Sequence, residues 1–223
     1  MSKLTRGEKG ENKVSEILSK QKGYFHLINN LTLQLEGGLT HQIDHLFMNE
    51  KGVFVIESKS IYGNIYPNIN DTIWVKVING KKMTMPNPII QNKSHVRIIR
   101  KLLGKDIELI SLVVFTLNNA PYMPDENVIN LEDLSLFIES YPGNMHLTHE
   151  QIDMINNYLL RKESDASMDE HLKNIKAIKK ERNEKQKEMT IAIERGVCPR
   201  CGNKIITKGD IFRCSKCDFS FHL

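Results

Sequence analysis

Four cysteines near the end of the chain constrain its fold more than any other sequence feature. They form two Cys-x-x-Cys pairs, Cys198 with Cys201 and Cys214 with Cys217, and twelve residues separate the pairs. Each pair can present two thiolates from one tight turn, and four thiolates complete the tetrahedral coordination that zinc prefers. Because a segment this short cannot build an adequate core by itself, the pattern predicts a closed, structural zinc site that supplies the folding energy.

Basic and aromatic residues alternate with these cysteines. Residues 198–205, Cys-Pro-Arg-Cys-Gly-Asn-Lys-Ile, and 213–219, Arg-Cys-Ser-Lys-Cys-Asp-Phe, resemble the zinc ribbons at the ends of bacterial type I topoisomerases. That resemblance implies a grip on single-stranded DNA through aromatic stacking and phosphate contacts. Two alternatives stay open: Phe212 and Phe219 form the ribbon's own core, with Phe221 freer to stack, or the ribbon contacts a partner protein. The basic residues are Arg200, Lys204, Lys208, Arg213 and Lys216.

The charge and hydropathy of the chain set broad limits on its partners. Lysine and arginine number 31 against 27 aspartate and glutamate residues, which gives a net charge of +4. This mild basicity permits a polyanionic partner without requiring one. The chain shows no apolar run of signal-peptide length and no stretch near the roughly 18 apolar residues of a membrane span. We therefore expect a cytoplasmic protein without membrane association, whose reduced thiols bind metal.

The spacing of apolar residues predicts a mixed domain ahead of the cysteines. Val14, Ile17 and Leu18 recur at helical spacing. Asn79-Gly80 is typical of a type I′ hairpin turn, and Asn87-Pro88 suits the cap and first position of a helix. The expected helices are 7–20, 87–103, 131–140 and 148–160, and the expected strands are 25–29, 31–35, 42–48, 53–59, 73–78, 82–85 and 109–116. This order predicts an α/β fold, with a mixed α+β sheet flanked by helices.

Charge density divides the chain into three parts. Residues 1–160 contain the predicted elements and form the expected main domain. Residues 161–196 are dense in charged residues and contain neither an aromatic residue nor a proline. That composition predicts a solvated helical linker, with a coiled-coil dimer as the weaker alternative. Residues 197–223 make up the expected zinc ribbon.

Two neighbouring predicted strands bring acidic residues together. The second strand is apolar on both faces up to Ile56, so we expect it to be buried, and alternation places Glu57 and Lys59 on one face. Folding the hairpin about its turn sets Asp44 opposite Glu57, with Cβ atoms about 4.5–5.5 Å apart. Carboxylates this close repel each other unless one takes up a proton or a cation lies between them. A hard cation such as Mg²⁺ or Mn²⁺ would resolve that repulsion.

Five short sequence blocks follow one another between Gly7 and Leu103. They are Gly7-x-x-Gly10-Glu11-x-x-Val14, Ile28-Asn29-Asn30-Leu31, Gln42-Ile43-Asp44-His45, Gly52-Val53-Phe54-Val55-Ile56-Glu57-Ser58-Lys59 and Asn87-Pro88-x-x-Gln91. In this order they resemble the nuclease-related domain (NERD) family. The family looks like a branch of the PD-(D/E)xK nuclease superfamily, which implies a restriction-endonuclease-like fold with a mixed sheet flanked by helices.

The resemblance also implies a role for particular residues. Asp44 and Glu57 would hold the catalytic Mg²⁺ or Mn²⁺ ion, and Lys59 would assist them. Glu11 would add a carboxylate from the first helix, and Gln91 would complete the pocket from a later helix. The implied reaction is metal-assisted hydrolysis of phosphodiester bonds, in DNA more than in RNA.

The sequence leaves three functions open. The leading one is a magnesium-dependent nuclease whose zinc ribbon helps to hold nucleic acid. The second is a nucleic-acid-binding protein that keeps the nuclease fold without catalysis, and the third is a scaffold in which the ribbon contacts a partner protein. Asp44, Glu57 and Lys59 favour the first, because a binding protein does not need opposed carboxylates. We expect His45 to be structural, since alternation directs it away from Asp44.

Overall fold

A computed structural model describes most of the chain as two compact units. The described residues are 4–34, 40–123, 126–144, 146–164, 184–185, 187–209 and 211–222. The first unit comprises Met1–Ile61 and Pro88–Asn174, and the second comprises Tyr62–Asn87 and Ile175–Leu223. Residues 62–87, which we call the insert, therefore group with the C-terminal residues, a grouping that no local sequence pattern indicates.

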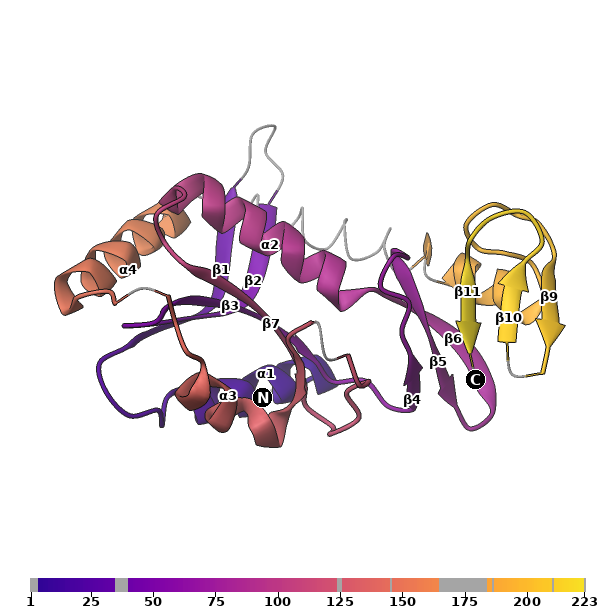
Figure 1. Ribbon diagram of the computed structural model, residues 1–223, viewed down its shortest axis with the longest axis horizontal. Helices are drawn as coiled ribbons and strands as arrows, with labels where there is room; N and C mark the ends of the chain where they lie inside the picture. Colours follow the sequence, from indigo (N-terminus) through magenta and orange to yellow (C-terminus); the bar gives the residue numbers. More distant parts are fainter. Residues whose placement is uncertain are drawn as a thin grey trace. The chain divides into compact units, whose positions relative to one another are not determined.

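A five-stranded mixed sheet forms the centre of the first unit (Figure 1). In the order β1-β2-β3-β7-β8, the first three strands pair antiparallel, whereas β7 and β8 run parallel to β3. The strands are β1 (His26–Gln34), β2 (Thr40–Asn49), β3 (Gly52–Lys59), β7 (Leu109–Phe115) and β8 (Val128–Asn130). Residues 53–56 of the central strand β3 are all buried, as their apolar run predicts.

Helices cover both faces of this sheet, with α2 and α4 on one face and α1 and α3 on the other (Figure 1). Their bounds are α1 (Arg6–Leu18), α2 (Pro88–Leu103), α3 (Leu134–Ser140) and α4 (His149–Ser164), with a 3-10 turn η1 (Leu131–Asp133) before α3. Alternation along β3 serves both faces, because Val55 packs with Ile99 of α2, whereas Phe54 packs with Val14 of α1. The predicted α/β fold, a mixed sheet flanked by helices, is confirmed.

Strands β1 and β2 are irregular at the same level of the sheet. β1 is continuous where the sequence predicts two short strands, and Asn30 inside it has a positive φ of 57°. On β2, Ile43 and Leu46 belong to the same apolar cluster, although strict alternation would direct them to opposite faces. Asp44 lies between them, so simple alternation does not determine the direction of its side chain.

Two three-stranded sheets form the described strands of the second unit. One has the order β4-β5-β6, and the other has the order β11-β10-β9. Their bounds are β4 (Asn64–Tyr66), β5 (Ile73–Ile78), β6 (Lys81–Pro86), β9 (Ile205–Lys208), β10 (Ile211–Cys214) and β11 (Ser220–His222). Asn79 and Gly80 join β5 to β6 with φ values of 50° and 75°. Positive φ at both positions is what a type I′ turn requires, so the predicted hairpin is confirmed.

The insert and the C-terminal sheet share one apolar core. Ile73 and Val75 of β5 belong to the same buried cluster as Phe219 and Phe221. Trp74, on the same strand, is 1% exposed, and its indole Nε1 donates to the carbonyl of Asn68 at 2.9 Å. The tryptophan is thus a core residue of the second unit.

Much of the predicted linker, residues 161–196, lies outside the described residues. Helix α4 continues to Ser164, and residues 187–194 are helical. The prediction for 165–183 and for residue 186 falls outside the described part of the chain. Across the residues that are described, no helix has both the length and the apolar character of a membrane span.

Candidate active site and cysteine cluster

The end of β3 places a carboxylate and an ammonium group beside each other. Glu57 is 2% exposed, and its Oε1 accepts a hydrogen bond from Nζ of Lys59. Its other oxygen, Oε2, lies 3.1 Å from Nε2 of His95. Burial disfavours the charged form of Glu57, but the charges and hydrogen bonds of Lys59 and His95 outweigh it and lower its pKa to about 2. Glu57 is therefore ionised at neutral pH and balanced by the protein's own donors.

Asp44 lies close to this pair on the neighbouring strand. The predicted register is present from Asn49–Gly52 to His45–Ile56, and Asp44 is the next residue along β2. Its Oδ2 accepts hydrogen bonds from Ser58, at 2.8 Å from the backbone N and 3.1 Å from Oγ. Asp44 is thus held at the end of β3 by the residue that follows Glu57.

The charge of Glu57 influences the protonation of Asp44. Burial and the charge of Glu57 raise the pKa of Asp44 to about 7. Lys59 and the backbone N–H of Ser58 oppose that rise without cancelling it. A carboxyl group that holds its proton up to neutral pH is the outcome expected where burial and a neighbouring carboxylate act together.

Helix α2 presents two side chains to the pair on β3. Oε1 of Gln91 accepts a hydrogen bond from Nζ of Lys59 at 3.1 Å, and His95, one turn later, contacts Glu57. Sequence reasoning found Gln91 but assigned no role to His95. The spacing of four residues between them, which places both side chains on one face of a helix, was the signal that could have found it.

Buried Asn92 fixes α2 on the sheet next to these side chains. Its Nδ2 donates to the carbonyls of Val55 at 2.8 Å and Leu112 at 3.1 Å, and lies 2.9 Å from Oγ of Ser111. These acceptors belong to the adjacent parallel strands β3 and β7. Because the amide bridges both strands, the turn of α2 that carries Gln91 and His95 is held in register with Glu57.

Glu11 approaches the site from the opposite face of the sheet. Its neighbour Gly10 is buried, and a Cβ atom there would lie 2.9 Å from both Ser60 Cβ and Thr116 Oγ1. Only glycine lets α1 approach the ends of β3 and β7 this closely. The charge of Glu11 contributes to the raised pKa of Asp44, as the smallest of its causes. Asp44, Glu57, Lys59 and Gln91 thus form one connected group, with Glu11 at its edge.

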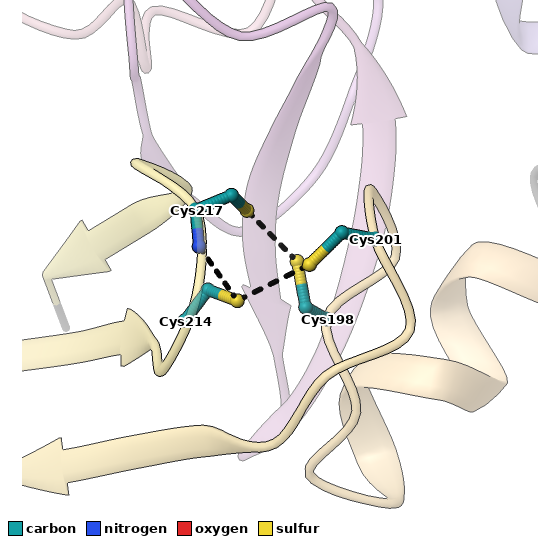
Figure 2. A group of neighbouring side chains, drawn as sticks. All are labelled: Cys198, Cys201, Cys214 and Cys217. Atoms are coloured by element: carbon teal, nitrogen blue, oxygen red, sulfur yellow. Dashed lines mark hydrogen bonds between the residues drawn. The ribbon is translucent and has the colours of Figure 1, made fainter.

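The four cysteines of the second unit converge on one point (Figure 2). Their Sγ atoms all lie within 4.8 Å of one another; those of Cys198 and Cys217 are 3.7 Å apart, and those of Cys201 and Cys214 are 3.3 Å apart. Thiolates at about 2.3 Å from a tetrahedral zinc ion would be separated by about 3.8 Å. The cluster therefore has the donor atoms and the size of a site for a metal ion such as zinc.

The thiols of this cluster titrate differently from one another. Burial raises the pKa of Cys198 to about 12, whereas hydrogen bonds from the backbone and side chain of Asn203 lower the pKa of Cys201 to about 6. The backbone N–H groups of Lys216 and Cys217 point to Sγ of Cys214, at 3.3 and 3.4 Å. Backbone and amide N–H donors thus surround the cluster, and a buried thiolate at Cys198 requires a cation.

The three ribbon phenylalanines pack internally. Phe221 is 3% exposed and stacks on Phe212, with ring centroids 4.8 Å apart and an interplanar angle of 3°. Phe219 is also buried and meets Phe221 edge-on. The expectation that Phe221 is freer than the other two was wrong, because the insert covers the face on which it lies.

The fold and these two clusters define a mixed α/β protein with a carboxylate–lysine group around buried Glu57 and a cysteine cluster that could hold a metal ion. The sequence pattern of the nuclease-related domain matches residues 6–116, and the chain belongs to this family, known as NERD. An uncharacterized protein of Bacillus anthracis is 34% identical over 163 residues, which cover 70% of this chain and 76% of that protein. No solved structure matches the chain.

Proposed function

We propose that the protein is a metal-dependent nuclease that cleaves phosphodiester bonds in DNA, with Asp44 and Glu57 as ligands of Mg²⁺ or Mn²⁺. The observation that supports this most directly is the proximity of the two carboxylates at the end of β3, where burial and then the charge of Glu57 raise the pKa of Asp44. Membership of the NERD family supports a nuclease-related activity. Asp44, Glu57 and Lys59 follow the order of the acidic residues and lysine in the PD-(D/E)xK pattern.

The residues fit a hard divalent cation. Two carboxylates supply the oxygen ligands that Mg²⁺ prefers, and a divalent cation can replace the proton that the partly buried carboxyl of Asp44 holds up to near neutral pH. Glu57 is already ionised, so binding requires the loss of one proton, from Asp44. Glu11, at the edge of the group, adds negative charge that favours a cation there.

In the proposed mechanism, each residue has a defined task. A bound divalent ion supplies Lewis-acid chemistry, which polarises a phosphate and acidifies water. Lys59 places a positive charge where negative charge develops on the phosphate in the transition state. Gln91 holds the ammonium group of Lys59 in position, and His95 holds the carboxylate of Glu57.

We also propose that the four cysteines hold a structural zinc ion and that the ribbon helps to bind nucleic acid. The Sγ separations are close to those of a tetrahedral tetrathiolate site. Four cysteine ligands leave no open position for catalysis, so the ion would stabilise the fold. Thiols that bind metal suit the reducing cytoplasm, which we propose as the location of the protein.

A nucleic-acid-binding protein without catalysis is the second candidate. It is favoured by the engagement of both oxygens of Glu57, one by Lys59 and the other by His95. A carboxylate balanced in this way is stable in the fold without a divalent ion.

An incubation with nucleic acids separates the two candidates. Purified protein is mixed with circular, linear and single-stranded DNA and with RNA, in the presence of Mg²⁺, Mn²⁺ or no added divalent ion. Glu57→Ala and Lys59→Ala should each lower the cleavage rate by at least about a hundredfold. Glu50→Ala, which removes an exposed carboxylate from the turn after β2, serves as the matched control. If all four proteins behave alike on every substrate, the catalytic proposal is wrong.

A further inference from the structure

The two units carry opposite net charge. Lysine and arginine number 15 in the second unit against 7 acidic residues, whereas the first unit has 16 basic and 20 acidic residues. The positive charge of the whole chain therefore comes entirely from the unit that contains the insert and the cysteines. A polyanion is attracted to the second unit and repelled by the first.

Polar contacts join the insert to the ribbon in addition to their shared core. Arg200, in the first Cys-x-x-Cys turn, lies 3.1 Å from Oδ1 of the buried Asp71. Nδ2 of Asn68 donates to the carbonyl of Ser220 at 3.0 Å. Both partners on the insert side lie in the segment between β4 and β5. These contacts make the insert and the ribbon one body.

The basic side chains of the ribbon strands point away from this shared core. Arg213 pairs with Ile206, and Lys208 pairs with Ile211, so these four residues lie on one face of the sheet. Phe212 lies on the other face, which packs in the shared core. Lys208, Arg213 and Ile206 are all exposed. We call this surface the outward ribbon face, and among its described strand residues none is acidic.

We propose that the insert and the ribbon form a single phosphate-binding module, and that the outward ribbon face contacts the backbone of the nucleic acid. This deepens the proposed nuclease function and rests on it for the choice of partner. The aromatic rings hold the ribbon on the insert and do not stack on bases, while Lys208 and Arg213 neutralise phosphates. Binding by the module is therefore independent of base sequence and strongly dependent on salt.

The position of the insert in the chain gives the module a direct link to the candidate active site. The chain enters the insert at Tyr62, three residues after Lys59, and leaves it at Asn87, four residues before Gln91. Lys59 and Gln91 are hydrogen bonded to each other. Nucleic acid held by the module is thus tethered through two short segments to the residues proposed to act on it.

The test measures binding of the full-length protein to short fluorescent single-stranded DNA, duplex DNA and RNA without added divalent ions. Lys208→Glu/Arg213→Glu removes two positive charges from the outward ribbon face. We expect affinity to fall about tenfold or more, and the slope of log affinity against log salt for duplex DNA to decrease by about 2. Lys22→Glu/Lys105→Glu makes the same change in net charge at exposed positions of the first unit and should leave both quantities near wild type.

Each outcome has a defined meaning. Equal losses in both double variants would show that net charge alone governs binding, and unchanged binding in the ribbon variant would show that this face is not used; either overturns the proposal. Metal content and the thermal unfolding midpoint establish that the ribbon variant is folded. If the wild-type protein does not cleave nucleic acid with Mg²⁺, the nuclease proposal is wrong, but the binding result for the outward ribbon face still stands. If cleavage depends on Glu57 but the ribbon variant binds like wild type, the nuclease proposal stands and the proposal for the outward ribbon face is wrong.

Discussion

Each unit buries groups that carry negative charge when they are ionised. The carboxylate group of the first unit and the cysteine cluster of the second differ in what balances that charge. In the first unit, Glu57 is buried against a large apolar core and is balanced by Lys59 and His95. In the second, the thiols of Cys198 and Cys214 are buried in a small core, and the donors around the cluster are backbone and amide N–H groups. A metal ion in the first unit would therefore serve chemistry, whereas one in the second would maintain the fold.

Removal of a cysteine ligand should destabilise the second unit more than any other change predicted below. Structural zinc contributes roughly 10–16 kcal/mol to the folding of small domains. Cys198→Ser should therefore unfold the ribbon and, through the shared core, expose β5 of the insert. Hydrogen exchange followed by mass spectrometry should show loss of protection in β5 and β10, while β3 and β7 stay protected. The control is Ser215→Ala, an exposed change between Cys214 and Cys217.

Two other exchange patterns would contradict this predicted difference between the units. Protection retained in β5 after loss of the metal would show that the insert is stable by itself. Loss of protection in β3 as well would show that the first unit also depends on the cysteine cluster.

Truncation of a ribbon phenylalanine measures how much packing, apart from metal binding, stabilises the second unit. Phe221 is buried among side chains of both the insert and the ribbon. Phe221→Ala should lower the free energy of unfolding of the second unit by about 3–5 kcal/mol. Ile206→Ala, at a position 55% exposed on the opposite face, should change it by less than about 0.5 kcal/mol. Chemical denaturation of zinc-loaded protein measures both; equal effects would mean that the insert does not bury the ring.

Most of the fold could be predicted because its signals are local. The apolar run in β3, the Asn79-Gly80 turn and the Asn87-Pro88 helix start each depend on neighbours in sequence. The turn between β2 and β3 also determines the register that brings Asp44 near Glu57. Local patterns therefore identified the mixed sheet and the pair of strands that carries the candidate site.

The remaining features depend on contacts between distant segments. The grouping of the insert with the ribbon rests on an apolar cluster that joins Ile73 to Phe221, which no local pattern indicates. The contact of His95 with Glu57 depends on where α2 lies on the sheet. Irregular strands near Asn30 likewise override the alternation from which the direction of Asp44 would be predicted.

The pH dependence of stability tests whether the folded protein raises the pKa of Asp44. The pKa of Asp44 is raised in the folded state from 3.8 to about 7, so the folded protein binds this proton more tightly than the unfolded chain. The contribution of Asp44 to stability should therefore decline as pH rises from about 4 to about 7, because ionisation of its carboxyl is favoured only after unfolding. Asp44→Asn removes that ionisation and should be more stable than wild type at about pH 8, by at most about 4 kcal/mol.

Thermal unfolding midpoints between about pH 5 and about pH 8 check this prediction without added divalent ions. The difference between the two proteins isolates Asp44, because the opposite contributions of Glu57 and of His45, whose pKa burial lowers to about 4, are common to both. Addition of Mg²⁺ at high pH should stabilise wild type more than Asp44→Asn. Parallel curves for the two proteins would show that the pKa of Asp44 is not raised in the folded protein.

The smallest predicted effect concerns the stabilisation of the Glu57 carboxylate by His95. His95→Phe leaves Oε2 of Glu57 without this partner and should lower the free energy of unfolding by about 1–3 kcal/mol. His95→Gln, which keeps a donor, should recover part of that loss. If the contrast between the units is correct, loss of His95 makes the first unit more responsive to metal, so Mg²⁺ should raise the unfolding midpoint of His95→Phe more than that of wild type. Equal responses would mean that His95 does not substitute for a cation at Glu57.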